Sequence, residues 1–160
     1  MDLKQNILDK VELKNTVGLS QLITRNIKTT SILNSIELDT PVTEIRIQHF
    51  LRGLKPLVSE FKQKQAMDAI VTVIETLFET WGYEFSRGEC FLIYHLKDLG
   101  KFRLKDDKFF TQLEGEWKQH KDYVLDQSEF KQSLKDLKNL KFLEYRRGTI
   151  IFNSVIVLRQ

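Results

Sequence analysis

The segment from Asp126 to Leu158 constrains the fold of this chain more than any other part of the sequence. Its first half, DQSEFKQSLKDLKNLK, places Phe130, Leu134 and Leu137 on one face of a helix. Its second half, FLEYRRGTIIFNSVIVL, has Gly148 between two stretches of alternating residues, which is typical of a tight β-turn. The segment therefore predicts an amphipathic helix that leads directly into a β-hairpin.

Length and composition predict a globular protein. The chain has 160 residues, of which 41% are hydrophobic and 29% charged, so wholesale disorder is not expected. This length allows one compact domain, or a small domain with a helical extension. Only 7 glycines and 2 prolines are present, which favours long helices over a loop-rich fold.

Several features predict an intracellular, cytoplasmic protein. The single Cys90 cannot form an internal disulfide, and it lies in the apolar run CFLIY, which favours a buried thiol over a reactive one. No apolar run approaches the roughly 18 residues that cross a bilayer, so no membrane association is expected. The N-terminal sequence MDLKQNILDKVELKN lacks the apolar centre of a signal peptide.

The first half of the chain reads as helical. We expect helices over residues 3–14 and from Leu19 to about residue 35, although the second stretch is rich in β-branched residues. Thr40-Pro41 is a typical helix start, while residues 44–48 also alternate like a strand. Gly53 and Pro56 are expected to end or kink that helix. Another helix is expected from Leu57 to Trp81, ended by Gly82.

Two capping signals organise the second half. Ser86 and Glu89 fit a capping box that opens a helix running to Leu99 and closed by Gly100, after which KFRLK reads as a basic loop. Asp106 or Asp107 can cap a helix to about His120, and Asp126 with Glu129 repeats the capping signal. We place a boundary between Gly82 and Phe85, which separates an N-terminal helical region (1–82) from a C-terminal region (83–160).

Positive charge is concentrated near the C-terminus. The net charge is +3 for the whole chain, and residues 1–85 have 10 basic and 11 acidic side chains. Residues 126–160 have seven basic residues and four acidic ones. On a helical wheel of residues 126–140, the lysines lie on one flank, the acids on the other, and Ser, Gln and Asn between them. Such a face suits phosphates on its basic flank and base edges on its amide-rich face.

Three capped helices followed by a hairpin resemble the winged helix-turn-helix family over roughly residues 83–158. The stretch LKDLKNLKFLE, residues 134–144, matches the leucine-rich pattern with which the third helix of that family runs into the first wing strand. Lys141 stands where family members usually have glycine, and the expected second helix is longer than theirs. The resemblance implies a mainly α fold with a C-terminal β-hairpin, namely an N-terminal helical region and a winged-helix domain.

The resemblance also implies which residues would contact DNA. The helix would lie in the major groove, with lysines on phosphates and the two arginines at the wing tip beside them. Gln127, Ser128, Gln132 and Asn139 are the candidates for reading bases. The expected phosphate contacts are Lys131, Lys135, Lys138, Arg146 and Arg147.

No pattern in the sequence predicts catalysis, a cofactor or a metal site. Phosphate-loop and dinucleotide-binding glycine patterns are absent. His49, His95 and His120 fall on separate expected elements, and Cys90 and His95 would lie about 140° apart on a helix. We therefore expect a protein that is not an enzyme.

Two functions remain open from the sequence. The first is a transcriptional regulator or DNA-associated accessory factor, whose N-terminal helices support the winged helix or form a homodimer. The second is an adaptor or subunit that uses the same fold to bind a protein partner. Its contact surface would include Trp81, Tyr83 and Phe85, or the pair Phe109 and Phe110.

Overall fold

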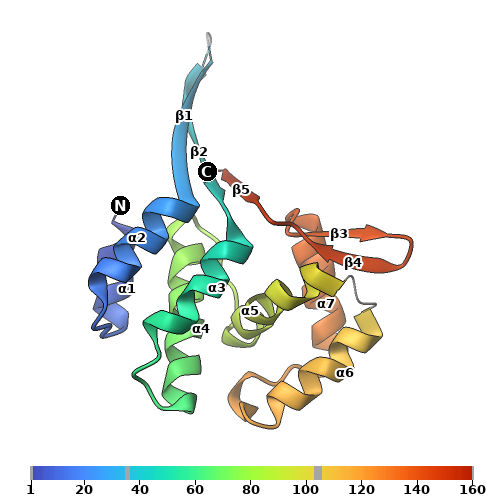
Figure 1. The fold of residues 1–160 in the computed structure, drawn as a ribbon. Helices are drawn as coiled ribbons and strands as arrows, with labels where there is room; N and C mark the ends of the chain where they lie inside the picture. The colour runs from blue at the N-terminus through green and yellow to red at the C-terminus, as the bar shows by residue number, and fades with distance from the viewer. Residues whose placement is uncertain (1, 35–36, 103–105, 160) are drawn as a thin grey trace.

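The structure is a computed structural model that describes residues 2–34, 37–102 and 106–159 (Figure 1). The described chain is mainly α, as expected, with small antiparallel sheets. The N-terminal elements are α1 (Leu3–Lys10), α2 (Thr16–Asn26), β1 (Ile27–Asn34), β2 (Glu37–Ile45), α3 (Ile47–Leu57) and α4 (Gln63–Thr80). They are followed by α5 (Arg87–Phe102), α6 (Asp106–Trp117), the 3-10 helix η1 (Lys121–Tyr123), α7 (Gln127–Asn139), β3 (Leu143–Arg146), β4 (Thr149–Phe152) and β5 (Ile156–Arg159).

A long β-hairpin takes the place of the end of one expected N-terminal helix and of the start of the next. The helix that begins near Leu19 ends at Asn26, and strand β1 takes the place expected for its remainder. Thr40 and Pro41 lie inside β2 and do not start a helix. Antiparallel pairing from Ile27↔Ile45 onward overrides the helix signals, and the β-branched residues of this stretch suit a strand. In Figure 1 this hairpin extends away from the helices.

Strand β5 joins the end of the described chain to the N-terminal hairpin. It pairs antiparallel with β2, from Val42↔Arg159 to Ile45↔Ile156, which gives a three-stranded sheet in the order β1-β2-β5 (Figure 1). Ile156 and Leu158 are buried, whereas Val157 is exposed. The regions on the two sides of Gly82 therefore share one sheet.

The helix expected over Leu57–Trp81 is interrupted at its start. Helix α3 continues through Gly53, which allows a close approach to Leu22 of α2, and ends at Leu57, just after Pro56. Helix α4 begins only at Gln63, and its apolar stripe is buried as the sequence predicts, including Met67, Ile70, Val71, Ile74, Leu77 and Phe78. Helices α3 and α4 are therefore two separate helices, joined by residues 58–62.

The capping signals of the second half are confirmed. Ser86 Oγ accepts from the Glu89 backbone N–H at 3.1 Å, and Glu89 Oε1 accepts from the Ser86 N–H at 3.1 Å. Helix α5 is longer than expected, because it passes Gly100 and ends at Phe102. The rest of the expected basic loop, residues 103–105, lies outside the described residues.

Three phenylalanines connect the two halves. Phe78 of α4 lies 5.1 Å from Phe85 and 5.4 Å from Phe142 between ring centroids, and Phe85 lies 6.1 Å from Phe142. Phe142 follows α7 directly and is 1% exposed. The C-terminal end of α7 is therefore packed against the end of α4.

Candidate nucleic-acid interface

Helix α7 begins at a complete capping box. Asp126 Oδ1 accepts from the Glu129 N–H at 2.8 Å, and Glu129 Oε1 accepts from the Asp126 N–H at 3.2 Å. The hydrogen bond from the Glu129 backbone holds the pKa of Asp126 below its usual value. Both carboxylates stabilise the positive end of the helix, so the first turn is well defined.

One face of α7 packs into the core and the other is exposed. Phe130, Ser133, Leu134 and Leu137 are buried, and three of these are the apolar residues that the sequence predicts. All seven α7 residues that were candidates for DNA contact are exposed: Gln127, Ser128, Lys131, Gln132, Lys135, Lys138 and Asn139. The packing of α7 therefore leaves the whole candidate set accessible to a partner.

The positive charges of the α7 lysines are not neutralised by ion pairs with other described residues. The side chains of Lys131 and Lys135 form no hydrogen bond or ion pair with any described residue. Lys138 instead places its Nζ atom 4.7 Å from the centroid of the Tyr145 ring, which belongs to β3. This contact brings the end of the lysine row next to the β3–β4 hairpin.

The amide-rich face contains an internal hydrogen bond between side chains. Gln132 Nε2 donates to Asp136 Oδ1 at 2.9 Å, one helical turn away. Asp136 thus brings a carboxylate beside Gln132, on the face expected to approach bases. A base contact by the Gln132 amide would require it to leave Asp136.

Lys141 follows α7 in a conformation that glycine most often adopts. The Phe142 N–H donates to Leu137 O at 2.9 Å, and the Lys141 N–H donates to Lys138 O at 3.0 Å, which is a Schellman motif. Lys141 has a left-handed φ of 68°, the conformation that glycine adopts most easily. Asn153 Nδ2 donates to Lys141 O at 2.7 Å and stabilises this turn.

The β3–β4 hairpin has its turn at Gly148, as expected. Leu143 pairs with Phe152, and Arg146 pairs with Thr149, leaving Arg147 and Gly148 at the tip. Both tip residues have positive φ, 50° and 76°, as a two-residue hairpin turn of type I′ requires.

The two candidate arginines differ in their contacts. Arg146 Nη2 forms an ion pair with Glu144 Oε2 at 3.1 Å. Both side chains are largely exposed, so this pair contributes little and leaves Arg146 able to move. Arg147 has no hydrogen bond or ion pair within the described residues.

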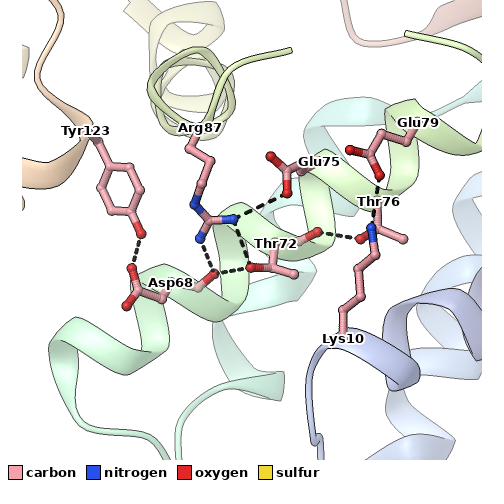
Figure 2. Close-up of polar contacts among 8 residues, drawn as sticks. All are labelled: Lys10, Asp68, Thr72, Glu75, Thr76, Glu79, Arg87 and Tyr123. Carbon is pink, nitrogen blue, oxygen red and sulfur yellow. Dashed lines mark hydrogen bonds and ion pairs between the residues drawn. The ribbon is translucent and has the colours of Figure 1, made fainter. Parts of the chain in front are cut away.

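A polar cluster between α4, α5 and η1 holds the segment that leads into α7 (Figure 2). Arg87 of α5 donates to Thr72 Oγ1 at 3.2 Å and forms an ion pair with Glu75 at 3.3 Å, both on α4. Tyr123 of η1 donates to the Asp68 carboxylate of α4. Burial and the hydrogen bond to Asp68 raise the pKa of Tyr123 to about 12. These residues are distant in sequence, and no local pattern predicted the cluster.

Cys90 and His95 lie on α5, where Cys90 is buried in the core and His95 packs against it. Burial raises the pKa of the Cys90 thiol to about 12, and it lowers the pKa of His95 to about 3. His95 lies 4.4 Å from the Phe91 ring centroid, and its buried Nε2 atom has no hydrogen-bond partner among the described residues. Within those residues, no group of three or more His, Cys, Asp or Glu side chains is arranged to hold a metal ion.

The aromatic residues proposed as a protein-binding surface mostly face inward. Phe109 is 1% exposed, and Trp81, Tyr83, Phe85 and Phe110 are partly buried against the core. Their burial removes most of the apolar area that a partner would need to contact.

Comparison with known proteins does not assign this chain to a family. No family model matches the chain, and no curated protein or solved structure shows significant similarity to it. In the described part of the chain, every helix is too short or too polar to cross a lipid bilayer.

Proposed function

We propose that this protein binds double-stranded DNA through α7 and the β3–β4 hairpin, in the manner of a winged helix, as a transcriptional regulator or DNA-associated accessory factor. The observation that carries the proposal is the exposed lysine row of α7, together with the contact between Lys138 and Tyr145. That contact joins the end of the row to the wing, so cations from both elements can approach one duplex.

The contacts divide into two kinds. Lys131, Lys135 and Lys138 would bind phosphates, with Arg146 and Arg147 on a neighbouring stretch of backbone. Gln127 and Ser128 lie in the first turn of α7, from which a helix in the major groove reaches bases. Gln132 and Asn139 would add base contacts further along the helix.

Fluorescence anisotropy with a mixed-sequence duplex, at low and at physiological salt, tests this function. Wild-type protein should bind in a salt-sensitive way, because phosphate contacts release counterions. Replacing Lys131 and Lys135 by glutamate should weaken binding to every duplex and lower the slope of log K against log salt by about 2. Gln132→Ala should mainly change sequence preference.

The matched control is Lys14→Glu with Lys62→Glu, which changes the net charge equally at two exposed lysines outside the interface. Affinity should then fall only modestly, through the long-range charge term. No binding by wild-type protein at low salt would refute the function. Recovery of one stoichiometric protein partner in high salt would instead favour the adaptor role, since an apolar interface is less sensitive to salt.

A further inference from the structure

A cleft of about 490 Å³ lies between α2 and α3, far along the sequence from α7. The two helices pack against each other (Figure 1). The polar lining of the cleft consists of Gln21, Arg25, Asn26, Arg46 and His49. Two arginines and a histidine thus converge on one cavity, and none of its lining residues is acidic.

Backbone contacts hold the two sides of this cleft in place. The Arg46 N–H donates to Asn26 O at 2.8 Å, which fixes the end of α2 beside the start of α3. Asn26 Nδ2 donates in turn to Leu22 O at 2.9 Å. Further along, a Cβ atom on Gly53 would lie 2.2 Å from Leu22 Cδ1, so a larger residue there would require the Leu22 side chain to shift. The fold therefore holds the backbone at Arg46 beside the end of α2, next to Arg25.

The positive charges of Arg25 and Arg46 are not neutralised by any described acidic side chain. Arg25 and Arg46 are exposed, and neither side chain has a hydrogen bond or ion pair with any described residue. Arg46 is the N-cap of α3 and makes no side-chain capping bond. A cation at this end of a helix is unfavourable, because the helix N-terminus is itself positive. A bound anion would reverse that unfavourable interaction.

The available donors fit a phosphate group. Two guanidinium groups can each give paired N–H donors to phosphate oxygens, and the first-turn N–H groups of α3 add more. The His49 ring and the Gln21 amide also line the cleft and carry N–H groups that can donate. An apolar ligand would leave both guanidinium groups without partners, and a cation would be repelled.

We infer that the cleft between α2 and α3 is a phosphate-binding site, built by Arg25 and Arg46 with help from His49. The phosphate can belong to a nucleic-acid backbone or to a small phosphorylated molecule, because both present the same oxygens. This inference does not depend on DNA binding by α7.

The test is a titration of the full chain with inorganic phosphate at constant ionic strength, followed by nuclear magnetic resonance. We expect saturable shifts of the arginine Nε–H signals of Arg25 and Arg46 and of the backbone amides of residues 47–49. Arg25→Gln with Arg46→Gln should weaken binding by about 10-fold or more, since each arginine supplies charge-assisted hydrogen bonds. Lys14→Gln with Lys62→Gln should leave the titration unchanged.

A second arm distinguishes the two sources of phosphate. Addition of a short duplex to the phosphate-saturated protein would displace phosphate if the site engages nucleic acid. It would leave the phosphate shifts in place if the site serves a small phosphorylated molecule. The absence of saturable shifts at these residues in wild-type protein would overturn the inference, whatever the behaviour of α7.

Discussion

Gly82 and Lys141 occupy the same position in two Schellman motifs, one at the end of α4 and the other at the end of α7. The Gly82 N–H donates to Glu79 O at 3.0 Å and the Tyr83 N–H to Phe78 O at 2.9 Å, which repeats the pattern seen around Lys141. Their φ angles are 84° and 68°. Lysine pays a steric cost in this region that glycine does not, because its Cβ crowds the backbone.

Replacing Lys141 by glycine should therefore stabilise the protein by about 1 kcal/mol. Urea unfolding followed by circular dichroism would measure the change in free energy of unfolding. Lys138→Gly is the control, since a glycine inside α7 should destabilise by about 1 kcal/mol. A loss of stability in Lys141→Gly would show that the lysine side chain contributes more than its backbone conformation costs.

Removing the charge of Asp136 should tighten DNA binding. The Asp136 carboxylate lies beside Gln132, so it would repel approaching phosphates, and Asp136→Asn should raise affinity roughly 2-fold or more at low salt. Asp9→Asn is a closely matched control, because Asp9 accepts a similar hydrogen bond at 2.8 Å from Gln5 on α1. Anisotropy titrations of both variants check the prediction, and equal affinities would exclude α7 as the contact surface.

Stability should fall in acid partly because of His95. Burial lowers its pKa from 6.5 to about 3 in the folded protein, so the unfolded chain binds the proton first as pH falls below about 6.5. His95→Phe should reduce this acid sensitivity by up to about 1.4 kcal/mol per pH unit over that range.

Urea unfolding at several pH values between 7.5 and 4, for wild type and variant, is the measurement. At pH 7.5 the variant should be as stable as wild type or more so, because the unpartnered His95 Nε2 is removed. Parallel pH profiles for the two proteins would contradict the assignment.

The pairing of β5 with β2 should contribute strongly to stability. Leu158 is 1% exposed, so Leu158→Ala should cost about 2–4 kcal/mol. Val157→Ala in the same strand is the control, since Val157 is 43% exposed and its loss should cost far less. Thermal or urea unfolding would compare them, and similar losses would mean that β5 does not pack as described.

The sequence predicted the features that depend on near neighbours. Capping at Ser86 and Asp126 needs only a residue three positions away, and the turn at Gly148 needs only its two flanking strands. The exposed lysines of α7 follow from helical periodicity in the same way.

Features that depend on distant partners could not be predicted. Alternation at residues 44–48 is compatible with a strand, but no local pattern shows that β1 pairs with β2 or that residues 156–159 add a third strand, so the helix-start signal at Thr40-Pro41 was misleading. The cleft of Arg25 and Arg46 could not be predicted for the same reason, because β1 and β2 separate these residues in the sequence. The hydrogen bond between Gln132 and Asp136 is local, since i,i+4 spacing brings the two side chains together on a helix.

The strand order β1-β2-β5 also bears on how the chain reaches this structure. Ile45 pairs with Ile156, so one edge of β2 stays open until residue 156 has left the ribosome, more than 100 residues after β2 itself. Closing so long a loop slows folding, and an open strand edge can meanwhile pair with another copy. Conditions that delay synthesis near residue 156 should therefore favour aggregation over correct folding.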